Sequence, residues 1–295
     1  MDNISLKLTW SPATRVLVLL CMALAGVIIA SSLTLCLAGM PRTAHLLCSV
    51  VAQDVIAFIL PALCACWLIF KRPWHIMGLD RAPSWQAVAI VLMVSIVAMP
   101  ALNWVIDWNA HIHLPASMAA IEKAMRTMED AAEAATKQIL DFNTIPAMLA
   151  VLFAVAVMAG VSEEMFFRGA MLRMMPKAGD SHLWVWVVAV AFSAIHMQFF
   201  GFVPRMLLGA WLGYLLVWTR SLWVPMIAHT LNNATVVVAA YLVNNGIVGK
   251  GALDHLGVPQ DGAFPLLALV SAIATVALVA FAHRQLFFKK NDKTP

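Results

Sequence analysis

The sequence is poor in charge: Asp, Glu, Lys and Arg make up 12% of the 295 residues, about half the share that is usual in a soluble domain. Hydrophobic residues make up 62%, and this much apolar surface requires lipid as its solvent. The chain also lacks a basic stripe with interleaved aromatic residues, which argues against a nucleic-acid partner. We therefore expect an integral membrane protein, with no second soluble domain, strong internal repeat or low-complexity tract.

Metal-binding and redox signatures are absent as well. The cysteine count is odd, and the spacing of the cysteines matches no metal or redox motif. No His-Glu-x-x-His sequence, the signature of many zinc proteases, occurs. We interpret the five cysteines as small hydrophobic residues embedded in the membrane: Cys21, Cys36, Cys48, Cys64 and Cys66.

Long apolar runs dominate the sequence. A membrane-spanning helix needs about 20 largely apolar residues, and this criterion predicts an all-α, polytopic bundle of about eight transmembrane helices. The first run is longer than the core of a signal peptide and shows no clear cleavage site. The fifth and sixth runs are short, so one of them is expected to be tilted or partly re-entrant. The predicted spans are residues 15–38, 45–70, 86–107, 145–167, 183–200, 203–220, 222–244 and 263–287.

The distribution of Lys and Arg predicts the orientation. With eight spans, the side that carries both termini holds 13 basic residues and the other side holds 6. Both termini are therefore expected to be cytoplasmic, most simply in the cell membrane. The 13 residues are Lys7, Arg15, Lys71, Arg72, Arg81, Arg168, Arg173, Lys177, Arg220, Arg284, Lys289, Lys290 and Lys293, and the 6 are Arg42, Lys123, Arg126, Lys137, Arg205 and Lys250.

One segment outside the membrane has a helical pattern. Apolar residues recur every three or four positions from Met118 to Ile139, which predicts an amphipathic helix over about residues 117–140. Two oppositely charged pairs four residues apart, Glu122 with Arg126 and Glu133 with Lys137, support it. The helix is expected to lie on the bilayer, to cap the bundle, to link two spans through solvent or to cover the active site.

The chain divides into three parts of one membrane domain. Residues 1–144 hold three membrane helices and the amphipathic segment, and residues 246–295 hold the last membrane helix and a tail. The central part, residues 145–245, contains every group that we consider for chemistry.

The fourth apolar run ends in Glu163, Glu164 and Arg168. Charges at membrane depth are costly and persist where they are paired or functional. Glu164 and Arg168 are four residues apart, so they share a helix face and can pair. Glu163 is rotated by about 100° from Glu164 and can point into the bundle. Two carboxylates with different surroundings differ in proton affinity, which allows one to act as an acid or base while the other is structural. Taken alone, the motif is explained equally well by an ion pair at the end of a helix.

Two later runs carry histidines. His196 follows Phe192 by four positions, and Asn233 follows His229 by four. Taken alone, His196 is more often a hydrogen-bonded packing residue. His229 and Asn233 face the same side of a helix and could both donate to a developing oxyanion, or could form polar contacts between helices.

Together the three motifs resemble those of the CAAX protease and bacteriocin-processing family, also called the Abi family, of intramembrane endopeptidases. The family pattern is Glu-Glu-x-x-x-Arg, then Phe-x-x-x-His, then His-x-x-x-Asn or Asp, and every motif position matches over roughly residues 145–245. The matching residues are Glu163, Glu164, Arg168, Phe192, His196, His229 and Asn233.

The resemblance implies an eight-helix fold with a water-filled cavity open to the cytoplasmic side, and a glutamate-dependent hydrolysis without a cofactor or metal. By this analogy Glu163 is the general base, and His196 holds and polarises the attacking water. His229 and Asn233 would stabilise the oxyanion, with Glu164, Arg168 and Phe192 in supporting roles; a direct share of Glu164 in catalysis stays open. The partner would be a peptide or protein at the membrane, such as a prenylated tail or a leader peptide. The sequence leaves the oligomeric state open.

Three alternatives stay open from the sequence alone. Glu163, His196 and His229 could ligate zinc with an open position for water. The motif residues could instead serve only the packing of helices in a non-catalytic scaffold or immunity-type protein. Charges within spans also occur in transporters, and Asp54 is a further deep acidic residue, but no matching pair of interrupted helices is evident. We expect Gln53 and Asp54 to form hydrogen bonds between helices or to line the cavity.

Overall fold

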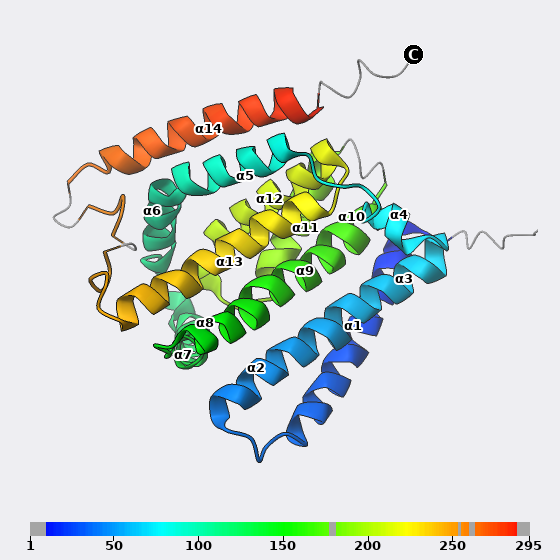
Figure 1. The fold of residues 1–295 in the computed structure, drawn as a ribbon, viewed down its shortest axis with the longest axis horizontal. Coiled ribbons are helices and arrows are strands. Elements are labelled where there is room, and N and C mark those ends of the chain that lie inside the picture. The colour runs from blue at the N-terminus through cyan, green and yellow to red at the C-terminus, as the bar shows by residue number, and fades with distance from the viewer. Residues whose placement is uncertain (1–9, 177–180, 253–254, 260–262, 288–295) are drawn as a thin grey trace, which may run out of the picture.

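The computed structural model describes residues 10–176, 181–252, 255–259 and 263–287, which form helices joined by turns (Figure 1). No β-strand occurs in these ranges, so the all-α prediction is confirmed. Five of the basic residues used for the orientation lie outside the described residues: Lys7, Lys177, Lys289, Lys290 and Lys293.

The N-terminal part is a hairpin of two long helices. Helix α1 (Pro12–Leu35) begins with Ser11, whose side chain accepts a hydrogen bond from the Thr14 N–H and so satisfies one of the free donors of the first turn. The second arm consists of α2 (Arg42–Gln53), a π-helical segment (Asp54–Ile59) and α3 (Leu60–Phe70). The short α4 (Pro73–Met77) follows.

The third apolar segment is bent. Helices α5 (Trp85–Val97) and α6 (Met99–Ala110) meet at an angle of 51°, because the ring of Pro100 cannot continue a straight helix. Ser271 compensates at the bend: its hydroxyl donates to the Val97 carbonyl and accepts from the Ala101 N–H. These two groups would otherwise pair with each other in a continuous helix.

The central helix carries the carboxylate motif and contains two π-helical segments. It runs through α8 (Ile145–Val151), a π segment (Leu152–Met158), α9 (Ala159–Glu164), a second π segment (Met165–Met171) and α10 (Leu172–Met174). π-Helical turns are rare and are frequent near functional sites. The remaining helices are α11 (His182–Ala194), α12 (Phe202–Thr219), α13 (Trp223–Asn244) and α14 (Leu266–Phe287).

All eight predicted apolar segments contain helix, but not all are long enough to cross a membrane alone. Among the described residues, six helices are long and apolar enough, and the bent α5–α6 pair brings the number to as many as seven. The exception is α11, whose 13 residues extend about 20 Å, short of the roughly 30 Å of a hydrocarbon core.

A turn that follows so short a helix needs its backbone groups paired if the helix lies within the bilayer, because unpaired groups are costly there. Polar side chains satisfy them: Ser193 donates to the Phe202 carbonyl. Asn109 of α6 donates to the Phe199 carbonyl and accepts from the Val203 N–H. The buried Asn109 thus stabilises the turn between α11 and α12.

The amphipathic segment is helical, as predicted. A short 3₁₀ turn (Ala116–Met118) leads into α7 (Ala119–Ile139). Both charged pairs form: Arg126 contacts Glu122 at 2.7 Å, and Lys137 contacts Glu133 at 2.6 Å. Arg126 also lies over the ring of Phe200 at 4.0 Å, so α7 packs on the turn that follows α11.

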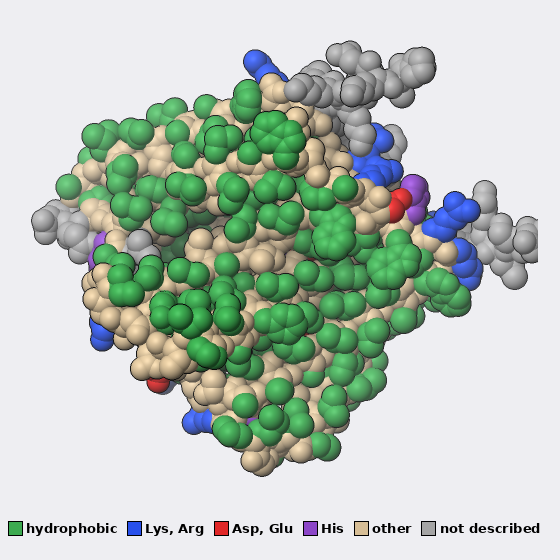
Figure 2. Space-filling model, in the orientation of Figure 1, with side chains coloured by type: hydrophobic (Ala, Val, Ile, Leu, Met, Phe, Trp, Pro, Cys, Tyr) green, Lys and Arg blue, Asp and Glu red, His purple; other side chains and the backbone are tan. Residues whose placement is uncertain are grey.

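The outer surface fits a lipid environment. Hydrophobic side chains cover most of the face in Figure 2, and Lys and Arg side chains gather at its edges. The five cysteines are free, and only Cys66 is buried. Exposed leucine and isoleucine side chains are frequent on α1 and α14, which indicates that these helices face lipid tails.

Candidate active site

A buried ion pair lies at the centre of the bundle. Arg168 Nη1 contacts Glu164 Oε1 at 2.6 Å, and both side chains have no exposed surface. Arg168 Nη2 also donates to the Gly209 carbonyl at 2.9 Å. Arg168 therefore belongs to the protein interior and not to a charged loop, so it drops out of the orientation count. Removal of either partner would leave an uncompensated charge in the interior, so each side chain keeps the other in place.

Glu163 points in a different direction from its neighbour. Its side chain retains 16% exposure, and its Oε2 atom lies 3.9 Å from His229 Nε2. This Oε2 has no hydrogen-bond partner in the described part of the chain. The two adjacent carboxylates thus have different surroundings: Glu164 is locked to Arg168, while Glu163 faces a cavity.

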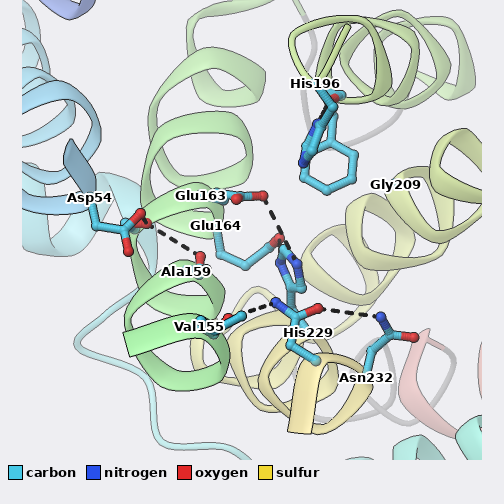
Figure 3. Close-up of polar contacts among 12 residues, drawn as sticks. Asp54, Val155, Ala159, Glu163, Glu164, His196, Gly209, His229 and Asn232 are labelled. Atoms are coloured by element: carbon cyan, nitrogen blue, oxygen red, sulfur yellow. Dashed lines mark hydrogen bonds and ion pairs between the residues drawn. The ribbon is translucent and has the colours of Figure 1, made fainter. Parts of the chain in front are cut away.

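His229 joins the two carboxylates. Its Nδ1 lies 3.0 Å from Glu164 Oε1, and its Nε2 faces Glu163. Figure 3 shows Glu163 and Glu164 reaching toward the His229 ring, with His196 on the far side of Glu163. Because one ring nitrogen is bound to Glu164, the orientation of the imidazole is fixed, and the other nitrogen is directed toward Glu163.

A glycine permits this approach of the two helices. A Cβ atom added to Gly160 of α9 would lie 2.9 Å from the backbone nitrogen of Thr230, which follows His229 on α13. Real Cβ contacts of this kind are not tolerated without a shift of the helices. Gly160 therefore lets α13 come close enough for His229 to reach Glu164.

Phe192 separates the two histidines. Its ring centroid lies 5.3 Å from that of His196 and 5.7 Å from that of His229. The Arg168 guanidinium stacks on the same ring at 4.4 Å. His196 Nδ1 lies 2.9 Å from the Phe192 carbonyl. A carbonyl only accepts, so Nδ1 carries the proton, and in the neutral ring Nε2 is left as an acceptor.

Asn233 has a partner that its motif position did not suggest. Its Nδ2 donates to the Val155 carbonyl at 3.2 Å, in the first π segment of the central helix. The neighbouring Asn232 lies beside it and also lines the cavity. An oxyanion role for Asn233 thus requires its amide to exchange the Val155 carbonyl for substrate.

The motif residues line one cavity of about 770 Å³. Its inner end is formed by Glu163, Phe192, His196 and His229, and its outer part by residues of α6 and α7. A volume in this range is large enough for several residues of a peptide. The site therefore has both a reactive end and room for substrate.

Asp54 was expected from the sequence to form a hydrogen bond between helices or to line the cavity, and it forms such a hydrogen bond. It is buried, and its Oδ1 accepts a hydrogen bond of 2.8 Å from Ser162 Oγ. Ser162 precedes Glu163, so Asp54 ties the N-terminal hairpin to the base of the site. The signal that points to it is a carboxylate in an apolar run. No motif marked Gly160 or Asn232, whereas covering the active site was one of the roles expected for the helix at residues 117–140.

Among the described residues, no group of three or more His, Cys, Asp or Glu side chains is arranged to hold a metal ion. The Nδ1 atoms of His196 and His229 are already engaged. Their Nε2 atoms remain available, so a chelator experiment decides the zinc alternative.

The chain resembles known proteins over part of its length. Residues 145–235 match the family model "Type II CAAX prenyl endopeptidase Rce1-like". Over 159 residues the chain is 23% identical to the uncharacterized protein YpbD of Bacillus subtilis (strain 168), covering 52% of this chain and 67% of that protein. No solved structure matches the chain. The Rce1-like match confirms the family resemblance and supports a CAAX-type protease in the membrane, with a peptide substrate.

Proposed function

We propose that this chain, whose residues 145–235 are Rce1-like, is an endopeptidase that cleaves a membrane-associated peptide with water activated by Glu163. The reaction as proposed uses no metal ion or cofactor. The N-terminal helices and α14 complete the membrane bundle around this region.

The observation that carries the proposal is the pair of unlike carboxylates. Glu164 Oε1 is held by Arg168 and His229, whereas Glu163 lines the inner end of the cavity. Among the described residues the Oε2 atoms of both carboxylates have no hydrogen-bond partner, but only that of Glu163 belongs to a side chain that borders the cavity. A water molecule in the cavity would satisfy this oxygen by donating to it. A general base must reach the proton that it removes, and Glu163 meets this requirement.

The proposed step balances within the site. Glu163 takes one proton of the water as the water oxygen bonds to the peptide carbonyl carbon, and the carbonyl oxygen becomes an oxyanion. The protonated Glu163 then gives the proton to the departing nitrogen as the C–N bond breaks. The products are a carboxylic acid and an amine, and the carboxylate is restored.

The two histidines have different tasks in this scheme. The Nε2 acceptor of neutral His196 holds the second proton of the attacking water and so orients its lone pair. His229 presents Nε2 toward the same space, and when it carries a proton there it donates to the oxyanion. Preorganised donors of this kind stabilise the transition state because they need no rearrangement.

Glu164 and Arg168 act through His229. Glu164 Oε1 is shared between Arg168 and His229, so the ion pair fixes the ring orientation of the histidine. This role is one of positioning, since neither buried side chain lines the cavity.

The first experiment compares membrane peptides from cells that express the wild-type chain, Glu163→Gln or Asp80→Asn. Asp80 is exposed, contacts His75 and does not line the site cavity, so its variant is the matched control. We expect products of wild type and Asp80→Asn to be missing from Glu163→Gln at equal protein level. Unchanged products in Glu163→Gln would reject the catalytic role and favour the scaffold alternative.

The second experiment addresses the metal. A peptide spanning a cleavage site found in the first experiment is incubated with purified protein, with and without a strong chelator. We expect the same rate in both. Loss of activity that zinc restores would replace the glutamate mechanism by zinc chemistry.

A further inference from the structure

Two arginines line the cavity of the candidate site, and only one of them is paired with a carboxylate. Arg126 contacts Glu122 at 2.7 Å. Arg205, in the first turn of α12, borders the same cavity as Glu163. Both hydrogen bonds of the Arg205 guanidinium within the described part of the chain go to Gln198, which is neutral. The proposed reaction gives Arg205 no task.

Gln198 and Gly201 hold the Arg205 guanidinium at the cavity wall. The Nη2 atom donates to Gln198 Oε1 at 2.7 Å, and the Nη1 atom donates to the Gln198 carbonyl at 3.3 Å. A Cβ atom on Gly201 would lie 3.1 Å from Nη2, so the glycine leaves room for the guanidinium. All three residues line the cavity. The arginine is therefore fixed by groups that do not neutralise its charge.

The guanidinium keeps donors for a further partner. It carries five N–H groups, and the bonds to Gln198 use two of them. The Arg205 Nε atom has no hydrogen-bond partner among the described residues and is not buried. The planar fork of these donors matches the two oxygens of a carboxylate. The start of α12, where the helix carries partial positive charge, also favours an anion.

The carboxylates that line the cavity leave this guanidinium unpaired. Glu129 and Glu163 interact with Arg205 electrostatically, but neither of these described residues forms an ion pair with it. Asp130 and Glu133 in the outer part of the cavity are exposed, so water and salt screen their charges. A carboxylate on a bound peptide can therefore reach Arg205 without displacing an ion pair of the protein.

Arg205 lies close to the reactive end of the cavity. Its charge interacts with both His196 and Glu163, and such interactions are largely screened beyond about 10 Å. An extended peptide spans about 3.4 Å per residue. A group of the substrate that binds Arg205 therefore lies only a few residues from the bond that is cleaved at Glu163.

We propose that Arg205 is a specificity-determining residue that binds a carboxylate of the substrate peptide a few residues from the cleaved bond. The inference rests on the proposed function and adds to it the charge of the substrate. The carboxylate is either the free C-terminus of the peptide or the side chain of an Asp or Glu residue. Because the contact is made equally in the ground state and the transition state, its loss should raise KM and leave kcat almost unchanged.

Four synthetic peptides test the charge of the substrate. Each spans a cleavage site that depends on Glu163 in cells and ends a few residues after it. The C-terminus is a carboxylate or a carboxamide, and the residue after the cleaved bond is Glu or Gln. Purified wild-type protein is compared with Arg205→Gln, Arg205→Lys and Arg126→Gln. Arg126→Gln is the matched control, because the charge of Arg126 is already paired with Glu122.

We expect wild type and Arg126→Gln to prefer a carboxylate form over its neutral counterpart by about tenfold or more in kcat/KM, the value of a hydrogen bond to a charged group. The peptide pair that shows the preference identifies the source of the carboxylate. Arg205→Gln should cleave the neutral peptides, which shows that it is folded, without any preference. Arg205→Lys keeps the charge but loses the fork, so it should retain only part of the preference.

Three results would overturn the inference. The first is equal kcat/KM for acidic and neutral peptides in wild type. The second is a preference that survives in Arg205→Gln or is undiminished in Arg205→Lys, and Arg205→Lys decides alone if Arg205→Gln does not accumulate. The third is an equal fall of kcat for all four peptides in Arg205→Gln, because Arg205 would then serve the charge balance or the folding of the site.

Binding separates this inference from the proposed function. The four peptides are titrated onto Glu163→Gln, which retains Arg205, and their dissociation constants are measured. Tighter binding of a carboxylate form, without cleavage of any peptide by wild type, would reject the proposed function and keep Arg205 as the carboxylate site. Cleavage by wild type with no carboxylate preference in rate or binding would keep the proposed function and overturn the inference.

Discussion

The N-terminal hairpin and the Rce1-like region are both built from long apolar helices, but they bury different surfaces. Helix α1 buries only Leu19, Gly26 and Ala30, and α2 buries no residue fully. In contrast, all seven residues of Met165–Met171 are buried, Arg168 among them. The hairpin uses its apolar residues against lipid, whereas the central helix surrounds its charges with protein. In a membrane, a polar residue thus marks the inside of the bundle more reliably than an apolar one.

The comparison predicts the largest stability effect at the buried ion pair. Arg168→Leu leaves the Glu164 carboxylate buried without its cation, which should cost about 3–5 kcal/mol. The measurement is the unfolding midpoint in detergent. The double variant Glu164→Gln, Arg168→Leu should recover much of this stability while remaining nearly inactive, because a neutral amide replaces the carboxylate that holds the His229 ring. Normal stability in Arg168→Leu would contradict a buried, charged pair.

A pair of glycine variants contrasts the two regions directly. Gly160→Ala pushes a methyl group against Thr230 beside His229, and Gly26→Ala pushes one against Ile56 and Ala57 in the hairpin. Overpacking of this kind costs about 1–3 kcal/mol, so both should lower the unfolding midpoint. Only Gly160→Ala should also lower kcat, because it moves His229 away from Glu164.

Equal losses of kcat per folded molecule in the two glycine variants would show that the hairpin shapes the site as much as α9 does. That result would contradict the conclusion that the central helix, and not the hairpin, positions the catalytic groups.

The contact between the regions, Asp54 with Ser162, should have an intermediate effect. Asp54→Ala removes the acceptor of a buried hydroxyl and should cost about 1–3 kcal/mol. Asp54→Asn keeps an acceptor and should cost less. Chemical denaturation of both variants measures the difference, and equal costs would show that the hydrogen bond is not the stabilising feature.

The smallest effect concerns how the start of α7 is fixed. The Leu114 N–H, the Arg126 side chain and His113 lower the pKa of the Glu122 carboxyl from 4.5 to about 2. This stabilisation is complete above pH 4.5, where the carboxylate is ionised in both states, and is lost as the pH falls toward 2. The protection factor of the Leu114 amide against hydrogen exchange, which is the intrinsic rate divided by the observed rate, should therefore fall over this range. In Glu122→Gln the protection factor should not vary with pH, and a constant protection factor in the wild type would contradict the contact.

The apolar runs and charge spacing were enough to predict the helices and the Glu164–Arg168 pair, because helix periodicity fixes which residues share a face. The direction of Glu163 away from Glu164 follows from the same geometry. The partners of Asn233 and Asp54 could not be predicted, since they join residues 78 and 108 positions apart. The length of α11 could not be predicted either, because α11 ends where the chain turns. This turn is stabilised by the side chain of Asn109, which belongs to another helix.

The sequence by itself determined that the chain is a membrane bundle, where its helices lie and which residues carry the motif, because hydropathy and helical spacing are local properties. Only the tertiary structure decided that Glu164 is enclosed while Glu163 faces a cavity, and that this cavity extends toward α7. These properties depend on how closely helices approach, as at Gly160, and on which surfaces they cover. Neither can be read from residues that are neighbours in the chain.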